Sequence, residues 1–179
     1  MKKLKLVLVG NGMAGVRTLE ELLKIEPDIY DITVFGAEPH PNYNRILLSP
    51  VLAGEQTIDE IVLNSFDWYA ANHITLHAGK KVVDVDRARR MVRAVDAQGG
   101  VTEAAYDRLL LCTGSNPFML PVPGKDLHGV IAYRDIADTQ AMIETARTHK
   151  NAVVIGGGLL GLEAANGLML RGMHGTAVR

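Results

Sequence analysis

The fold of this chain is decided by the stretch Leu6-Val7-Leu8-Val9-Gly10-Asn11-Gly12-Met13-Ala14-Gly15. Its apolar start is typical of a strand that is buried in a parallel sheet. Residues 13–25 then place apolar side chains near one helical face, and residues 31–35 read as a second strand. A Gly-x-Gly-x-x-Gly pattern inside such a β-α-β unit of about 30 residues predicts a dinucleotide-binding site.

Each of the three glycines has a physical reason to be there. Gly10 permits the tight turn out of the strand, Gly12 lets the backbone approach a pyrophosphate, and Gly15 lets the helix pack closely on the strand. The start of the helix, at Met13 and Ala14, offers unpaired N–H groups and a partial positive charge to phosphates. We therefore expect a dinucleotide to place its diphosphate on this loop.

A second motif of the same kind, Gly156-Gly157-Gly158-Leu159-Leu160-Gly161, follows an apolar strand and opens a helix-like run. By the same backbone geometry, Gly156, Gly158 and Gly161 are expected to bind the pyrophosphate of NADH or NADPH. The strand after this helix is expected to be barely present in residues 176–179. Gly175 also occupies a would-be strand position, which strands disfavour. Two such motifs predict a chain that places a flavin against a nicotinamide and moves electrons.

The segment between the motifs reads as several short elements. Residues 36–54 are loop-rich, and residues 57–63 and 65–72 have the character of short helices. Residues 106–111 return to a continuous apolar strand, and residues 135–150 have helical spacing. Before that strand we expect an antiparallel insertion of short strands separated by turns, at 73–77, 81–86, 91–95 and 101–105.

The composition is that of an ordinary soluble globular protein. Of the 179 residues, 47% are hydrophobic and 22% are charged, and the net charge is -1, so we expect neither a nucleic-acid partner nor a membrane partner. No apolar run approaches the ~18 residues that span a bilayer, and no signal-peptide pattern opens the chain, which predicts a cytoplasmic protein. The single cysteine, Cys112, excludes an internal disulfide, and the six histidines lack metal-ligand spacing, so no metal site is expected. The oligomeric state stays open.

Three stretches resemble a known family. These are Pro41-Asn42-Tyr43-Asn44-Arg45-Ile46-Leu47-Leu48-Ser49, Gly79-Lys80-Lys81-Val82 and Leu109-Leu110-Leu111-Cys112-Thr113-Gly114-Ser115-Asn116-Pro117. They are similar to segments of FAD-dependent reductases of the ferredoxin and rubredoxin reductase type, which belong to the pyridine nucleotide-disulfide oxidoreductase superfamily. A narrower resemblance rests on Val7 and the first glycine motif, together with Phe35-Gly36-Ala37-Glu38-Pro39 and Asn42-Tyr43-Asn44-Arg45. These residues are most similar to the N-terminal FAD region of the large subunits of NAD(P)H-dependent nitrite reductases.

The resemblance implies an α/β fold with two parts. The first is a Rossmann-like FAD-binding domain, which has a parallel sheet and an antiparallel β insertion and is expected to be incomplete over residues 1–120. A connection and helix over residues 121–150 then lead to the truncated start of a second Rossmann-like NAD(P)-binding domain over residues 151–179.

The resemblance also implies cofactor contacts. The diphosphate of FAD would lie on Gly10–Gly15, and its adenosine would lie near Glu38, the nearest carboxylate after the second strand, and near the backbone of Val82. NAD(P)H would place its nicotinamide near Glu163. The flavin end of FAD would meet the remaining predicted contacts, which are Arg45, Ser49, Thr113 and Gly114. Pro50 departs from the family, in which a lysine often follows the loop serine.

The implied function is an electron-input module of a nitrite reductase large subunit. Electrons would pass from NAD(P)H through FAD to downstream redox domains or an electron-acceptor protein, and sirohaem and an iron–sulfur cluster are expected only in a missing downstream part. No catalytic acid or base is identified, and the chain alone is expected not to reduce nitrite. Two alternatives stay open: a stand-alone flavin reductase of the rubredoxin or ferredoxin type, and a non-catalytic FAD-binding fragment.

Overall fold

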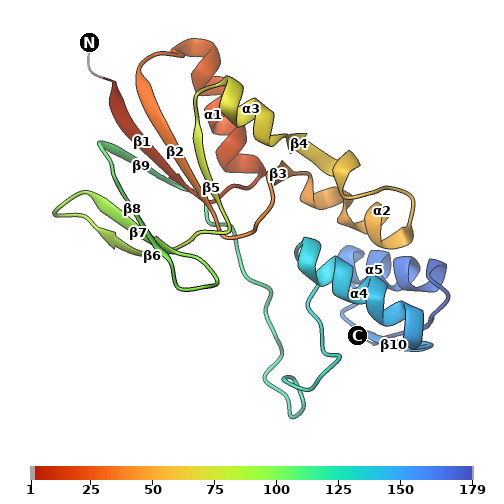
Figure 1. The fold of residues 1–179 in the computed structure, drawn as a ribbon. Helices are drawn as coiled ribbons and strands as arrows, with labels where there is room; N and C mark the ends of the chain where they lie inside the picture. The colour runs from red at the N-terminus through yellow and green to blue at the C-terminus, as the bar shows by residue number, and fades with distance from the viewer. Residues whose placement is uncertain (1–2, 179) are drawn as a thin grey trace. The chain divides into compact units, whose positions relative to one another are not determined.

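The computed structural model describes residues 3–178, which form two compact units. The first unit contains the residues up to Tyr43 together with Val62–Gly114, and the second contains Asn44–Ile61 together with the residues from Ser115 onward. The chain therefore leaves the first unit for Asn44–Ile61, returns to it, and leaves again after Gly114. Figure 1 follows this path by colour.

A four-stranded parallel sheet forms the centre of the first unit. Its strands are β1 (Leu4–Val9), β2 (Tyr30–Gly36), β5 (Thr75–Ala78) and β9 (Arg108–Leu111), in the order β5-β2-β1-β9. Helix α1 (Met13–Ile25) connects β1 to β2, which confirms the predicted β-α-β unit. Val9 pairs with Phe35 on one side and with Leu111 on the other, so the carboxyl ends of three strands meet at one edge.

The sheet is covered on both faces, as Figure 1 shows. Leu6 and Leu8 pack against α1 and against α3 (Phe66–Ala71), whereas Val7 and Val9 point the other way. The second face packs against an antiparallel sheet of β6 (Lys81–Asp86), β7 (Met91–Val95) and β8 (Val101–Ala105). Because successive side chains of a strand alternate between faces, the continuous apolar run of β1 fills two cores. The predicted α/β class with an antiparallel insertion is confirmed.

Three expectations about short elements of the first unit and the inserted segment were wrong. The segment predicted at 73–77 as the first strand of the insertion is β5, which pairs with β2 in parallel, since Thr33 lies opposite Thr75. The helix predicted at 57–63 is only a 3₁₀ turn, η2 (Asp59–Ile61), which runs into β4 (Val62–Asn64), antiparallel to β3 (Asn42–Tyr43). The loop-rich stretch contains η1 (Arg45–Leu47) and α2 (Leu48–Ala53). Each error concerns a partner that local sequence does not reveal.

The second unit is built around two parallel strands, β10 (Asn151–Ile155) and β11 (His174–Val178). Helices α4 (Ile136–Thr148) and α5 (Leu159–Leu170) belong to it, and Leu52 from α2 is fully buried in its core. The expectation that the strand after α5 is barely present was wrong, because β11 pairs with β10 along its whole length and Gly175 lies opposite Ala152. The remaining buried members of this core are Ala146, Ala164, Leu168 and Met173.

Candidate functional site

The first glycine loop is built by close backbone packing at the carboxyl edge of the parallel sheet. Gly10 has a φ of +108°, which L side chains rarely adopt, and its N–H donates to the carbonyl oxygen of Phe35 at 2.8 Å. A Cβ on Gly10 would collide with the carbonyl oxygen of Cys112. A Cβ on Gly15 would lie 3.0 Å from the carbonyl oxygen of Gly10 and 3.1 Å from the Cβ of Cys112. A side chain at Gly10 would require a shift of the backbone, and one at Gly15 would require its neighbours to move by a few tenths of an ångström.

Gly12 differs from both of these glycines because the space around it is open. It is the N-cap of α1, and a Cβ built there would meet no heavy atom within 4 Å. The first turn of α1, which includes Met13 and Ala14, carries no acidic side chain. Since the first N–H groups of an α-helix have no acceptor inside the helix, this end favours an anion. The residues present therefore fit a diphosphate group.

Thr113 and Gly114 lie beside the same loop. They follow β9, and the N–H of Cys112 donates to the carbonyl oxygen of Val9 at 2.8 Å, which holds the end of β9 against the end of β1. Both residues are exposed, and Gly114 has a φ of +72°. The structure thus brings this turn to the edge at which α/β sheets bind ligands.

The loop after β2 carries Glu38, which is half-buried. Its carboxylate accepts a hydrogen bond from the hydroxyl of Tyr43 at 2.7 Å, and its backbone carbonyl accepts from the N–H of Gly79 at 2.9 Å. The N–H of Lys80 donates to the carbonyl oxygen of Gly36 at 2.8 Å. These bonds tie the loop of Glu38 to the start of β6, the strand of Val82. A register shift after Val82 marks a β-bulge, a feature that is frequent next to functional sites.

Asn11 was not predicted as a site residue, yet its side chain joins several parts of this edge. Its Nδ2 donates to the carbonyl oxygen of His40 at 3.2 Å, and its Oδ1 accepts from the hydroxyl of Tyr69 at 2.7 Å. Burial raises the pKa of Tyr69 to about 12, although its hydrogen bonds with the backbone of Asn42 and the side chain of Asn11 oppose that rise. The hydroxyl therefore keeps its proton at neutral pH. Tyr69 lies 58 residues from Asn11, so no local pattern could reveal the pair.

The second glycine loop has the positive-φ turn and the open helix start of the first, but a Cβ at Gly156 would meet nothing within 4 Å. Gly156 has a φ of +127°, and its N–H donates to the carbonyl oxygen of Val178 at 2.9 Å, as that of Gly10 does to Phe35. A Cβ on Gly161 would collide with the carbonyl oxygen of Gly156. Gly158 is the N-cap of α5, and a Cβ there would meet nothing within 4 Å. The loop therefore fits a second diphosphate.

Glu163 of α5 takes part in a chain of side-chain hydrogen bonds within the second unit. The hydroxyl of Ser49 donates to the Glu163 carboxylate at 2.7 Å, and the hydroxyl of Tyr133 donates to Ser49 at 3.1 Å. Burial raises the pKa of Tyr133. The hydrogen bond to Ser49 lowers this pKa, and the negative charge of Glu163 raises it further. Arg45 donates to the carbonyl oxygen of Arg134 at 2.9 Å. The predicted flavin-end residues Arg45 and Ser49 thus have partners in their own unit, and Tyr133 is a further residue that sequence reasoning missed.

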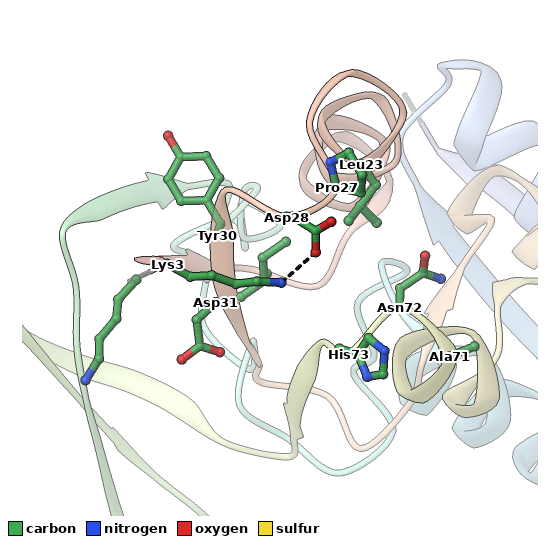
Figure 2. Close-up of a pocket in the computed structure, with 11 residues that line it drawn as sticks. Lys3, Leu23, Pro27, Asp28, Tyr30, Asp31, Ala71, Asn72 and His73 are labelled. Atoms are coloured by element: carbon green, nitrogen blue, oxygen red, sulfur yellow. Dashed lines mark hydrogen bonds and ion pairs between the residues drawn. The ribbon is translucent and has the colours of Figure 1, made fainter. Parts of the chain in front are cut away.

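A pocket of about 480 Å³ lies at the opposite end of the parallel sheet. Lys3, Tyr30 and His73 line it, near the amino ends of β1, β2 and β5, and Lys3 forms an ion pair with Asp28 at 2.9 Å (Figure 2). Both glycine loops follow the carboxyl ends of strands. The pocket therefore contains none of the predicted site residues.

Clusters of metal ligands and membrane-spanning helices are both absent from the described part of the chain, residues 3–178. Among these residues no group of three or more histidine, cysteine, aspartate or glutamate side chains is placed to hold a metal ion. In the same part of the chain, every helix is too short or too polar to cross a lipid bilayer.

Comparison with known proteins identifies the relatives of this chain. The family described as pyridine nucleotide-disulphide oxidoreductase matches residues 4–179. Two proteins of Bacillus subtilis (strain 168) match over 182 residues and 99% of this chain: nitrite reductase [NAD(P)H] at 54% identity and the assimilatory nitrate reductase electron transfer subunit at 50%. The chain spans only 22% and 23% of these two proteins.

A solved structure with the same fold is the NADH:rubredoxin oxidoreductase of Clostridium acetobutylicum. Its TM-score is 0.84 and its sequence identity is 25%, with 98% of this chain and 44% of that chain covered. The match extends over both units of the present chain.

Proposed function

Because this chain belongs to the pyridine nucleotide-disulphide oxidoreductase family, we propose that it is the FAD-dependent, NAD(P)H-oxidising electron-input region of a nitrite reductase large subunit. The observation that carries the proposal is the pair of glycine loops, each at the start of a helix whose N-cap glycine is open. The similarity to a nitrite reductase [NAD(P)H] supports the choice of enzyme. Because this chain spans only 22% of that relative, nitrite reduction is proposed for a longer protein that contains this region.

We assign the two nucleotides to separate stretches. Residues 1–120 would form the FAD-binding domain, residues 121–150 a connection and helix, and residues 151–179 the start of the NAD(P)-binding domain. The division agrees with the family pattern of two Rossmann-like domains. The first and the last of these stretches each contain one glycine loop.

The FAD-binding residues are proposed as follows. The backbone of Gly10, Gly12 and Gly15, with the N–H groups of Met13 and Ala14, would bind the diphosphate at the start of α1. The adenosine would lie near Glu38, whose carboxylate Tyr43 orients, and near the backbone of Val82. The proposed contacts at the flavin end are Thr113, Gly114, Arg45 and Ser49.

The nicotinamide nucleotide is proposed to bind on the second loop. Gly156, Gly158 and Gly161 would hold its pyrophosphate at the start of α5. Glu163 is the side chain proposed near the nicotinamide, and Ser49 and Tyr133 fix the direction of its carboxylate. The open surroundings of Gly158 leave room for phosphate oxygens.

The chemistry that bound FAD supplies is acceptance of a hydride from the nicotinamide and release of electrons one at a time. The protein's part is to bind both nucleotides and orient them. The electrons would leave for sirohaem and iron–sulfur centres outside this chain, either in downstream redox domains or in an acceptor protein. Nitrite would be reduced there.

A second candidate function is supported by the assimilatory nitrate reductase electron transfer subunit, which matches over the same length. In that case the electrons would pass to a separate nitrate-reducing subunit. The full-length protein separates the two candidates. NAD(P)H-dependent loss of nitrite without any added protein supports the first candidate, whereas loss of nitrate only with a partner subunit supports the second.

The proposed electron input is tested by anaerobic titration of the FAD-loaded chain with NADH and with NADPH. We expect at least one of them to bleach the visible flavin absorption of the wild type. Gly158→Val should retain FAD but lose the bleaching, since its side chain fills the open N-cap of α5. Flavin that stays oxidised with both nucleotides would overturn the proposal for this chain.

A further inference from the structure

The first glycine loop is held in place by side-chain hydrogen bonds as well as by its backbone contacts. Asn11 stands between the packed Gly10 and the open Gly12, and both ends of its amide group are engaged, one by His40 and the other by Tyr69. A Cβ on Gly36 would lie 2.9 Å from the Cβ of Asn11, so Asn11 also packs directly on the last residue of β2. The side chain of Asn11 therefore links the phosphate loop to the loop that carries Glu38.

Tyr69 extends this link into a polar network inside the first unit. Its side chain is 2% exposed, and its hydroxyl donates to Asn11 while it accepts from the backbone N–H of Asn42. The Asn42 amide donates to Asn64 at 2.8 Å, and Asn64 donates to Glu20 of α1 at 2.8 Å. The bond from Asn64 and the nearby Arg17 lower the pKa of Glu20, which stays charged. The network thus runs from the middle of α1 back to the loop at its N-terminus.

Such a network affects binding because backbone N–H groups bind an anion only when they are held in place. A loop that is ordered before binding does not lose conformational entropy when the ligand arrives, which raises affinity without any new contact. Buried polar groups that find hydrogen-bond partners in only one conformation of a loop also stabilise that conformation. Asn11 and Tyr69 form their hydrogen bond in the conformation that leaves the space around Gly12 open.

We propose that Asn11 and Tyr69 are positioning residues, which hold the Gly10–Gly12 backbone and the loop of residues 37–41 in the conformation that binds the adenosine diphosphate half of FAD. The inference rests on the proposed FAD site and adds to it two residues outside the glycine pattern. Neither residue needs to touch the isoalloxazine ring. Their effect should therefore be the same for FAD and for ADP.

Calorimetric titration of the chain with FAD and with ADP tests this. Tyr69→Phe removes one hydroxyl and keeps the ring, and Asn11→Ala removes the amide. In each variant we expect the Kd values for FAD and ADP to rise by the same factor. That factor should be about 5- to 10-fold for Tyr69→Phe, which loses one buried hydrogen bond, and larger for Asn11→Ala, which loses two. Tyr30→Phe, which removes a hydroxyl at the opposite end of the sheet, should leave both Kd values unchanged.

A charged variant separates positioning at the phosphates from a general loss of stability. Asn11→Asp keeps an acceptor for Tyr69 but adds a negative charge beside the diphosphate. We expect its FAD affinity to be weakest at low salt and to recover toward that of Asn11→Ala as salt screens the repulsion. A variant that binds weakly only because it is less stable would not recover in this way.

The outcomes are distinct. Unchanged Kd values in folded Tyr69→Phe and Asn11→Ala would overturn the inference and leave the FAD site standing, as would a change for FAD but not for ADP. If Tyr69→Phe does not fold, Asn11→Ala decides, because Asn11 is only half-buried. A wild-type chain that binds neither FAD nor ADP would overturn the proposed function together with this inference.

Discussion

Gly10 and Gly12 are the same residue type in one loop, but their surroundings are opposite. The backbone of Cys112 lies against Gly10, whose positive φ excludes most side chains. Gly12 has a φ of -91° and no neighbour within 4 Å of a Cβ. One glycine is therefore required by the fold, and the other leaves room for a ligand.

This difference predicts separable effects of two alanine substitutions. Gly10→Ala should lower the free energy of unfolding by about 2–4 kcal/mol, because the new Cβ strains the backbone and meets Cys112. Gly12→Ala should leave the unfolding free energy nearly unchanged and weaken FAD binding. Urea unfolding and FAD titration measure the two effects. Equal loss of stability in both variants would contradict the contrast.

His77 is the residue whose titration should affect stability near neutral pH. Its ring stacks on Phe35 at 4.9 Å between centroids, and burial, followed by the charge of Lys80, lowers its pKa. Below about pH 6.5 an unfolded histidine takes up a proton that folded His77 does not, so stability is lost as the pH falls from that value toward the folded pKa. Above that range its contribution is fully present.

Urea unfolding at about pH 7.5 and about pH 5.5 tests this. The wild type should lose more stability between the two values than His77→Gln does. His128→Gln, a change at an exposed position, should behave like the wild type. If His77→Gln loses as much stability as the wild type, the neutral, half-buried ring does not contribute.

Among the elements, α2 is the one whose place was least evident from the sequence. The sequence placed Pro50 in a loop, but it lies in the first turn of α2. N–H groups in the first turn have no acceptor inside the helix, so the missing N–H of proline costs no helical hydrogen bond there. Arg171 donates to the carbonyl oxygens of Leu52 at 2.7 Å and Val51 at 3.0 Å, and thereby joins α2 to the end of α5. This contact spans more than a hundred residues of sequence.

The packing of α2 on α5 gives a prediction about Gly167. Alanine is the better helix former, but a Cβ at this position would lie 2.7 Å from Cγ of the fully buried Leu52. We expect Gly167→Ala to destabilise the chain by about 1–3 kcal/mol. The exposed neighbouring substitution Asn166→Ala should be neutral or stabilising. Both are measured by urea unfolding.

The collision itself is tested in a double variant. In a Leu52→Ala background the added cost of Gly167→Ala should disappear, because the crowded atoms are gone. An equal cost in both backgrounds would show that Leu52 is not the cause.

The elements that could be predicted are those whose pattern is local. The strand, glycine loop and helix of each motif follow from apolar runs and glycine spacing. The parallel pairing of β5 with β2 and the presence of β4 could not be predicted, since such short sequences do not reveal which strand they pair with. β11 forms despite Gly175, where even an added Cβ would make only ordinary contacts with neighbours from α5. Tertiary pairing overrides local preference there.

The same limit applies to the candidate sites. Spacing identified the glycines, and the family resemblance added Glu38, Ser49 and Glu163. The structure adds Tyr69 and Tyr133, whose partners lie 58 and 84 residues away in sequence.

For the whole molecule, the central claim is that this chain binds FAD on its first glycine loop. The most direct measurement is the visible absorption spectrum of the purified chain after incubation with FAD and desalting. We predict a flavin band of close to one flavin per chain for the wild type and none for Gly12→Val, whose side chain occupies the open helix start. A folded wild-type chain without a flavin band, or a Gly12→Val chain that retains the same amount, would contradict the claim.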